Sequence, residues 1–588
     1  MILVFGGTTE GRKAAEVLEE SGTTYYYSTK TGEQDVVLQH GIRIDGALDA
    51  EAMLTFCQEH GIRLIVDAAH PFAAVLHQTI AQVAEALNMP AIRYERIYPP
   101  RDSSIVWIDD YSQVPTDIHT LLATTGVQSI GRLKPLEAKG VKVVYRILPR
   151  ESSVALARKQ GATADQLCYY GDSSHIDVEA DAILLKESGL SGGFPEKVAA
   201  ARARGMRIIA LKRPGLSFRH CVNGPYGLRR SVEKLLPEFY PLHSGLTTGT
   251  CATAAAIAAT RQLLYGESPS EVPVLLPNGE TISVAVGYAD GYAYCIKEAG
   301  DDPDVTNGLE IRASVERDAR CKVRGARIAI RGGEGVGRFT LPGFDYPPGE
   351  AAINKAPREM IENNLRAILS PLSPLSSPLS VTISVPQGAE IARRTFNPRL
   401  GIEGGISIIG VSGIVKPFSE EAFVDSIRKC MTVAKASGAE RVVINSGGKS
   451  ERYVKALYPA LPRQAFVEYG NYIGETLKTA HELHFKAVTL GVMLGKAVKL
   501  AQGHLDTHSR KTTMDLDFIR QLLQESGIGI DISGITLARE LWDRIPEGHL
   551  NGFAQTVIRH CAAHCQPLLP DGSLTILLID DNGKIYEL

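Results

Sequence analysis

The sequence lacks the features that mark a membrane, secreted or nucleic-acid-binding protein. No apolar run approaches the ~20 residues that span a bilayer, and an apolar segment rather than the basic stretch of a signal peptide follows Met1. The nine cysteines are scattered and form no CxxC pair, which is typical of a reducing compartment. A net charge of −3 offers no basic surface for nucleic acid or anionic lipid. We therefore expect a cytoplasmic protein without a nucleic-acid or membrane partner.

The length predicts several lobes rather than one. A chain of 588 residues is too long for a single core, and 44% hydrophobic with 22% charged residues is typical of globular proteins. The order of apolar runs and turns predicts an α/β multidomain fold. Its predicted parts are a two-lobed Rossmann-like region over 1–240 (lobes about 1–104 and 105–240), an α+β region over 243–400 and a doubly wound Rossmann-like region over 401–588.

A glycine-rich turn near the start predicts a nucleotide site. The apolar strand Ile2–Phe5 leads through this turn into a helix over Lys13–Glu20, which is the opening of a dinucleotide-binding fold. The residues that would face the cofactor are Gly6, Gly7, Thr8 and Gly11. The spacing is GGTTEG rather than GxGxxG, so a tight β–α turn without a ligand is the alternative.

The end of the next strand favours one nicotinamide cofactor over the other. An NAD site places an acid there to hold the ribose diol, whereas this strand ends in Ser28, Thr29 and Lys30. Hydroxyls and a cation suit a 2′-phosphate. The sequence therefore predicts NADPH.

Polar residues also follow the buried strand Arg63–Ala68. Asp67 and His70 lie where parallel strands face a ligand crevice, so His70 is a candidate to bind substrate or donate a proton. The alternative is that both residues cap the helix predicted over 74–87. Arg96, one of three arginines near the same crevice, would suit a polycarboxylate substrate.

A second anion cradle is predicted in the second lobe. The strand Ala182–Lys186 runs into a Gly/Ser-rich turn, and a helix starts at Pro195. Lys186, Ser188 and Gly189 are the candidate cofactor contacts at this turn, because a helix start offers N–H groups to an anion.

The second half opens on HSGLTTGTCATAAA, which leads into an alanine-rich helix. Thr247, Thr248 and Thr250 are candidate substrate contacts, because hydroxyls at a helix start cap free N–H groups and favour an anion. The alanines would allow close approach of another backbone or of a flat ligand. Asp302, within EAGDDPDVT, is a candidate general base, with an ordinary structural turn as the alternative.

From residue 401 the pattern changes to β–α alternation. Four apolar strands, the first over Ile406–Val411, each end in glycine, which predicts a crevice where backbone approaches a flat ligand. The candidate cofactor contacts are Gly413, Gly447, Gly448 and Gly470. Arg399, just before this region, is a candidate for substrate carboxylates.

Near the C-terminus, His560-Cys561 and His564-Cys565 repeat at helical spacing. Paired His and Cys can bind zinc, but no second ligand pair accompanies them. A half-buried core face is the favoured interpretation, and no metal site is predicted. The Pro/Ser-rich stretch 370–380 is interpreted as a surface loop.

Three motifs in order give the first part a family resemblance. ILVFGGTTEGR, DAAHPFA and LLKESGLSGG resemble the precorrin-6A reductase family of cobalamin biosynthesis, over essentially all of residues 1–240. The resemblance implies NADPH-dependent reduction of a ring double bond in a corrin precursor, and it assigns no proton donor.

The second part resembles another family of the same pathway. HSGLTTGTCATAAA, EAGDDPDVTNG, GEGVGRFTLPG, TFNPRLGIEGGISIIGVSGIV, YGNYIGE and LGKAVKLAQGHLDTHS resemble the cobalt-precorrin-5B C1-methyltransferase family over residues 243–588. The resemblance implies methyl transfer from S-adenosyl-L-methionine to a ring carbon of a cobalt-containing tetrapyrrole.

Together the two resemblances imply a multifunctional enzyme that is both oxidoreductase and transferase. A non-catalytic tetrapyrrole carrier, or a reductase–methyltransferase fusion acting on another substrate, are the alternatives. The sequence leaves the oligomeric state open, and a homo-oligomer is compatible with it.

Overall fold

A computed structural model describes the chain except residues 31, 33, 171–175, 177, 216–217, 318–327, 370–377 and 509–510. It divides into two compact units. Unit 1 comprises Met1–Ser244 and Pro273–Ser283, and unit 2 comprises Gly245–Val272 and Val284–Leu588. The division at Ser244 lies beside the joint expected at 240–243, but a hairpin from the second half belongs to unit 1. Most of the predicted Pro/Ser-rich loop lies outside the described residues.

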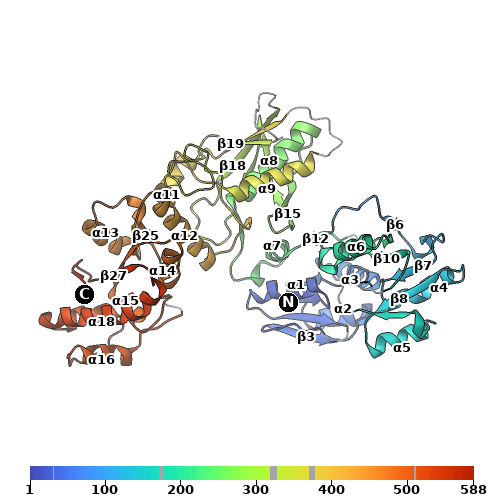
Figure 1. Ribbon diagram of the computed structural model, residues 1–588, viewed down its shortest axis with the longest axis horizontal. Helices are drawn as coiled ribbons and strands as arrows, with labels where there is room; N and C mark the ends of the chain where they lie inside the picture. Colours follow the sequence, from blue (N-terminus) through green and yellow to red (C-terminus); the bar gives the residue numbers. More distant parts are fainter. Residues whose placement is uncertain are drawn as a thin grey trace. The chain divides into compact units, whose positions relative to one another are not determined.

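Unit 1 begins with a six-stranded parallel sheet (Figure 1). In spatial order its strands are β12 (His220–Val222), β5 (Ala91–Tyr94), β4 (Leu64–Asp67), β1 (Ile2–Phe5), β2 (Tyr25–Thr29) and β3 (Gly41–Asp45). The accompanying helices are α1 (Thr9–Glu19), α2 (Ala50–Glu59), α3 (Ala74–Ala86) and α7 (Pro225–Leu235). The central strands β1 and β4 are buried along their whole length, as continuous apolar runs in parallel sheets require.

A second parallel sheet of six strands follows. Its order is β6 (Val106–Ile108), β11 (Arg207–Leu211), β10 (Ala182–Lys186), β7 (Thr120–Ala123), β8 (Lys142–Ile147) and β9 (Leu167–Tyr169). The helices between these strands are α4 (Ile130–Glu137), α5 (Glu151–Lys159) and α6 (Phe194–Ala203).

The lobe boundary differs from the predicted range of 105–240. After β11 the chain returns to the first sheet, where β12 pairs with β5 and α7 packs against α1. The amphipathic helix α7 therefore completes the first lobe rather than the second. The prediction assigns α7 to the second lobe because it follows that lobe in the sequence, and nothing in the sequence shows that the chain returns to the first sheet.

Unit 2 begins with a buried helix on a mixed sheet. Helix α8 (Thr248–Tyr265) and helix α9 (Lys355–Ile368) pack together, and α8 also contacts β17 and β18. The sheet order is β16 (Gly287–Ala289), β17 (Tyr292–Ile296), β18 (Glu310–Arg317), β21 (Leu379–Ser384) and β19 (Ile328–Gly332). Strand β19 is parallel to β21, and the other pairings are antiparallel. The alanines of α8 are almost fully buried in this contact, so they serve close approach of protein backbone.

Short strands also pair outside the larger sheets. The hairpin strands β14 (Glu271–Leu275) and β15 (Thr281–Ala285) pair with each other, as do β13 (Gly245–Leu246) with β23 (Ile414–Val415) and β20 (Arg338–Phe339) with β22 (Ile402–Glu403). The short helices α10 (Gly388–Ile391) and α11 (Asn397–Leu400) precede β22.

The last part of unit 2 carries a five-stranded sheet. Its order is β25 (Phe466–Glu468), β24 (Arg441–Asn445), β26 (Ala487–Met493), β27 (Ser573–Ile579) and β28 (Ile585–Tyr586), of which only β28 is antiparallel to its neighbour. Its helices are α12 (Glu420–Ala436), α13 (Gly448–Leu457), α14 (Ile473–Glu482), α15 (Leu494–Ala501), α16 (Leu516–Glu525), α17 (Leu541–Arg544) and α18 (Leu550–Cys565).

The strand predicted over Ile406–Val411 does not join this sheet. Ile406 and Ile408 form only isolated bridges, with Val336 and Ile353. Both isoleucines are buried while Val411 is exposed. The segment therefore packs one side against the protein core outside the sheet. Of the four expected strands, three, which are β24, β25 and β26, therefore belong to this sheet.

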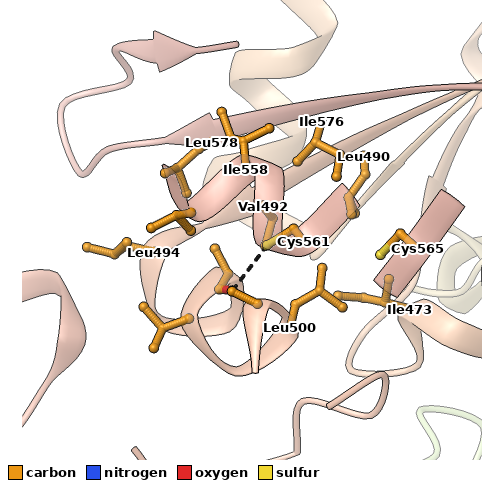
Figure 2. Close-up of a cluster of buried hydrophobic side chains, with 14 of the residues drawn as sticks. Ile473, Leu490, Val492, Leu494, Leu500, Ile558, Cys561, Cys565, Ile576 and Leu578 are labelled. Carbon is orange, nitrogen blue, oxygen red and sulfur yellow. Dashed lines mark hydrogen bonds between the residues drawn. The ribbon is translucent and has the colours of Figure 1, made fainter. Parts of the chain in front are cut away.

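The two cysteines at the end of α18 are core residues. Figure 2 shows Cys561 and Cys565 among apolar side chains that include Val492 and Leu578. The Cys561 thiol donates to the carbonyl of Ala497 at 3.2 Å. Burial raises the pKa of Cys565 to about 12 and that of Cys561 well above its usual range. Both thiols are therefore held protonated and inert at neutral pH.

Alkylation tests this burial. We expect N-ethylmaleimide to label the exposed Cys221 of the native protein first, although burial raises the pKa of its thiol, and to leave Cys561 and Cys565 unmodified until denaturant is added. Mass spectrometry of the digested protein measures each site. Rapid native labelling of either α18 cysteine would contradict the core assignment.

Candidate functional site

The first sheet brings the predicted cofactor and catalytic residues to one edge. Phe5 is in register with both Ser28 and Asp67, and Asp67 with Arg93. Because these strands are parallel, the segments that follow them lie side by side. The glycine turn, the 28–30 segment and the 67–70 segment therefore lie at the same end of the sheet.

The glycine turn is rigid and closely packed. A Cβ on Gly6 would lie 2.1 Å from the Tyr27 hydroxyl, so only glycine fits there. Gly7 has a positive φ of 84° and open space around it. Thr8 caps α1, accepting from the Gly11 N–H at 3.0 Å and donating to the Ala68 carbonyl at 2.7 Å. The turn is thus shaped before any ligand binds.

Gln34 is a member of this turn that sequence reasoning missed. Its side-chain oxygen accepts from the Gly7 N–H at 2.9 Å and from the Tyr27 hydroxyl at 2.6 Å. Its amide nitrogen donates to the Thr8 carbonyl at 2.6 Å. No local pattern marks a glutamine five residues beyond the end of β2, so nothing in the sequence could have identified it.

The 28–30 segment is only partly available to a ligand. Ser28 and Thr29 are buried, and the Thr29 hydroxyl donates to Asp45 at 2.8 Å. Lys30 is exposed. The sequence predicts no acid at the end of this strand, but the neighbouring strand β3 brings Asp45 there.

Asp67 lies in a fully buried cluster of charges. Its carboxylate accepts from His77 Nδ1 at 2.6 Å and from Arg93 Nη1 at 2.9 Å. Arg93 Nη1 also donates to the Ala69 carbonyl at 3.0 Å. The carboxylate is thus engaged with protein on both oxygens, and it holds the strand ends in place rather than facing the crevice.

His70 is exposed at the same edge. Its Nδ1 accepts from the Phe72 N–H at 3.2 Å, which leaves the proton on Nε2. Desolvation of the imidazole, and then the charges of Arg96 and Lys186, lower the pKa of His70. At neutral pH His70, which is exposed, is therefore an uncharged imidazole with an N–H to offer.

Arg96 links the edges of the two sheets. It is buried, its Nε donates to Glu10 at 2.8 Å and its Nη1 donates to the Ser188 carbonyl at 2.8 Å. Glu10 also accepts from Ser191. The guanidinium is therefore occupied by protein, although it was expected to meet substrate carboxylates.

The second cradle stands beside this link. Gly189 has a φ of 69°, and a Cβ there would meet Arg96 and the Ile97 carbonyl at 2.9 Å. The Lys186 ammonium lies 5.0 Å from the Phe72 ring centre, and burial lowers its pKa. The His70 ring also lies beside Phe72, so Lys186 and the uncharged His70 share one neighbour.

In unit 2 the predicted threonines bind the chain itself. Thr247 caps α8 by accepting from the Thr250 N–H at 3.2 Å. Thr250 donates to the Gly413 carbonyl at 2.6 Å, and the Thr248 hydroxyl accepts from the Ile409 N–H at 2.8 Å. The segment 407–413 therefore covers this helix start. Gly413 lies with the threonines and apart from the strand-end glycines with which it was grouped.

Asp302 and its neighbours form a structured turn. The Asp302 carboxylate accepts from the Phe418 N–H at 3.0 Å. Lys297, almost fully buried, pairs with Asp304 at 2.6 Å, and the ion pair helps to lower the pKa of Asp304 against desolvation. The sequence does not predict this Lys297–Asp304 pair, because Lys297 directly follows the alternating strand β17 and a buried cation is unexpected there.

The strand-end glycines of the last sheet do lie together. β24 and β25 are adjacent and parallel, and a Cβ on Gly447 would lie 2.4 Å from the Glu468 carboxylate. Gly448 has a φ of 53° and open space, and Gly470 lies against Phe423. These residues make a second backbone-lined edge.

Arg399 reaches this second edge. It pairs with Glu451 at 2.9 Å and approaches Glu468 at 3.7 Å. One of its terminal nitrogens, Nη1, is buried without a hydrogen-bond partner in the described part of the chain. Desolvation raises the pKa of Glu468. Arg399 therefore keeps hydrogen-bonding capacity beside the glycine-lined edge.

Two absences apply to the described residues. Among them, no three His, Cys, Asp or Glu side chains are arranged to hold a metal ion. None of the helices that the structure describes combines the length and apolarity needed to cross a bilayer.

Comparison with known proteins gives each half a match. Residues 1–233 match the family "Precorrin-6x reductase CbiJ/CobK", and residues 237–417 match the family CbiD. The chain is 41% identical over 350 residues to the cobalt-precorrin-5B C(1)-methyltransferase of Prosthecochloris aestuarii, covering 58% of this chain and 94% of that protein. It is 43% identical over 301 residues to the protein of that name from Brucella canis, covering 50% and 80%.

Two solved structures are also similar. A cobalamin biosynthesis protein (CbiD) from Archaeoglobus fulgidus is 29% identical, covers 49% of this chain and 85% of its own, and has a TM-score of 0.26. CobK precorrin-6A reductase is 19% identical, covers 40% and 96%, and has a TM-score of 0.31. The sequence matches carry the assignment: the chain belongs to the cobalt-precorrin-5B C(1)-methyltransferase family over its second part, joined to a first part of the precorrin-6x reductase CbiJ/CobK family.

Proposed function

We propose that this chain catalyses two steps of corrin-ring construction: NADPH-dependent reduction of (cobalt-)precorrin-6A and S-adenosyl-L-methionine-dependent C1-methylation of cobalt-precorrin-5B. The observation that supports the proposal best is coverage, because the chain spans 94% of a methyltransferase relative and carries a reductase family match over 1–233 in addition. The substrates are flat tetrapyrroles that carry many carboxylates.

In unit 1 the first glycine turn fits a nucleotide. Gly7 has open space where a side chain would stand, and its N–H points at an acceptor, the Gln34 oxygen. A pyrophosphate oxygen is an acceptor of the same kind. NADPH bound there would supply a hydride to a ring carbon, with the adenosine end near Lys30.

The protein groups then have defined roles in the reduction. Lys186 would attract the carboxylated macrocycle. His70, uncharged and with its proton on Nε2, would donate a hydrogen bond to the substrate rather than act as an imidazolium acid. Asp67 and Arg96 would hold the crevice in shape, through His77 and Arg93 and through Glu10 and Ser188.

In unit 2 the second glycine-lined edge fits S-adenosyl-L-methionine. Gly447, Gly448 and Gly470 would allow backbone approach, and Glu468, which lies against Gly447, would accept from a ribose diol. The bound cosubstrate would supply an electrophilic methyl group, and the protein would act by aligning a ring carbon with it. Arg399 would meet substrate carboxylates, and Asp302 stays a candidate base. Gly413 is left out of this site because it bonds to Thr250.

Paired assays test the proposal. Purified protein should oxidise NADPH only when given precorrin-6A or its cobalt form, and should convert S-adenosyl-L-methionine to S-adenosylhomocysteine only with cobalt-precorrin-5B. Tetrapyrrole binding without either turnover would instead identify a carrier. Turnover of one cosubstrate only would restrict the proposal to that half.

Lys30 gives a sharper test of the cofactor. Replacing Lys30 by Ala should raise the KM for NADPH about tenfold, the loss of one charge-assisted phosphate contact, and leave the KM for NADH unchanged. Lys13, exposed on α1, provides the matched variant Lys13→Ala, which should alter neither value. Equal changes with both cofactors would place the 2′-phosphate elsewhere.

A further inference from the structure

The hairpin β14–β15 belongs by sequence to one half of the chain and by contacts to the other. It lies within the CbiD match of 237–417, yet residues Pro273–Ser283 belong to unit 1. Figure 1 shows β15 beside β12 and α7. The tip is a turn in which the Leu276 N–H donates to the Glu280 carbonyl at 2.8 Å and Gly279 has a φ of 86°.

The tip supplies the cap that α7 lacks. The residue before α7 is Gly224, which has no side chain to accept from the helix start. The Glu280 carboxylate takes that role, accepting from the Gly227 N–H at 3.0 Å. A Cβ on Gly224 would lie 2.3 Å from the Glu280 carboxylate, so glycine makes room for it. A carboxylate at a helix N-terminus is favoured by the free N–H groups and the helix dipole.

The contact between the hairpin tip and the start of α7 is buried and hydrogen-bonded. Glu280 is 1% exposed, and its second oxygen accepts from Asn278. Asn223, which follows β12, accepts from the Thr281 N–H at 2.8 Å. Burial raises the pKa of Glu280, while the hydrogen bonds from Asn278 and Gly227 oppose the shift. A buried carboxylate is costly unless its acceptors are satisfied, so both oxygens must stay paired.

The same tip touches the segment that joins the two sheets of unit 1. A Cβ on Gly279 would lie 3.7 Å from Ile97 Cδ1. The Ile97 carbonyl accepts from the Leu190 N–H at 2.9 Å, and Arg96 next to it donates to the Ser188 carbonyl. The tip therefore abuts the stretch 95–98 that sets where the second cradle stands.

We propose that the hairpin 273–283 of the methyltransferase half is a working part of the reductase half, with Glu280 as a positioning residue that fixes the start of α7 and the segment 95–98. The proposal rests on the reductase function assigned above. It makes the two activities structurally dependent: the reductase crevice takes its final shape only when the hairpin is seated.

The test uses the full-length protein and the variants Glu280→Ala and Glu280→Gln. Alanine removes both acceptors, and glutamine turns one acceptor into a donor that faces an N–H group. Hydrogen exchange of peptides covering 223–230 should speed up by about tenfold in both variants, the usual effect of losing a helix cap. Asp290→Ala, an exposed carboxylate in the turn between β16 and β17, is the matched control and should leave exchange unchanged.

Kinetics separates positioning from simple stability. We expect the KM for the tetrapyrrole in the reduction to rise by about tenfold in Glu280→Ala with kcat retained, because the crevice is displaced rather than unfolded. Methyl transfer should be unaffected. A lower kcat with an unchanged KM would indicate partial unfolding and overturn the positioning role, as would unchanged exchange at 223–230. If the wild-type protein reduces no substrate, the proposed function fails while the exchange result still decides the role of the hairpin.

Discussion

Replacing Asp67 by Asn should destabilise unit 1 by about 3–5 kcal/mol, the cost of leaving one buried charge without its partner. Asp67 is fully buried and pairs with both Arg93 and His77. Arg93 is itself almost fully buried, and its Nε has no hydrogen-bond partner in the described part of the chain. Without the Asp67 charge, the guanidinium would have only carbonyl oxygens and a distant Glu95 at 3.5 Å.

Denaturant unfolding measures this effect. The sequence has two tryptophans, Trp107 in unit 1 and Trp542 in unit 2, so fluorescence in a Trp542→Phe background reports unit 1 alone. Asp117→Asn is the matched control, because it breaks an exposed ion pair with Arg207 and exposed pairs contribute little.

A double variant completes the test. Asp67→Asn combined with Arg93→Met should recover part of the lost stability, because it removes the charge that Asp67→Asn leaves unpaired. A cost below about 1 kcal/mol for Asp67→Asn would contradict the structural role, and Asp67 would return as a candidate for direct catalysis.

Single helices and strands can be predicted from the sequence more readily than the strands and helices that they pack against. β1, the glycine turn and α1 could be predicted because an apolar run, a glycine pair and a capping threonine act locally. The return of the chain to the first sheet through β12 could not, because three residues carry no pattern that names β5 as their partner. Local sequence signals thus predict the two sheets of unit 1, whereas the boundary between its lobes depends on tertiary contacts.

The candidate sites show the same division. Regular β–α alternation predicts Gly447, Gly448 and Gly470 at one strand edge, and the parallel strands β24 and β25 end side by side there. Gly413 was grouped with them on the same pattern, but its preceding segment packs at the start of α8 instead. The partners contributed from a distance, such as Asp45 to Thr29 and Glu280 to α7, have no signature in the sequence near the groups that they serve.

Replacing Gly245 by Ala should abolish most methyl transfer by disturbing the join between two family motifs. Gly245 belongs to HSGLTTG, and a Cβ on it would lie 2.2 Å from the carbonyl carbon of Ala299 in EAGDD. The obstacle is backbone rather than a flexible side chain, so it cannot move aside. Next to it, the Leu246 N–H donates to the Glu298 carbonyl at 2.6 Å. Overpacking of this kind costs about 3 kcal/mol or more.

The expected loss of methyl transfer is on the order of a hundredfold. The overpacking displaces the motif that leads into α8, and about 3 kcal/mol added to the reaction barrier slows the reaction by that factor. Gly552→Ala is the matched control, because Gly552 lies in α18 with nothing within 4 Å of the added Cβ, and alanine is the better helix former. S-adenosylhomocysteine formation with cobalt-precorrin-5B and the unfolding of unit 2 are the two readouts. Full activity in Gly245→Ala would mean that β13 and the 298–302 turn can separate, and the packing of these two motifs would then have no part in the reaction.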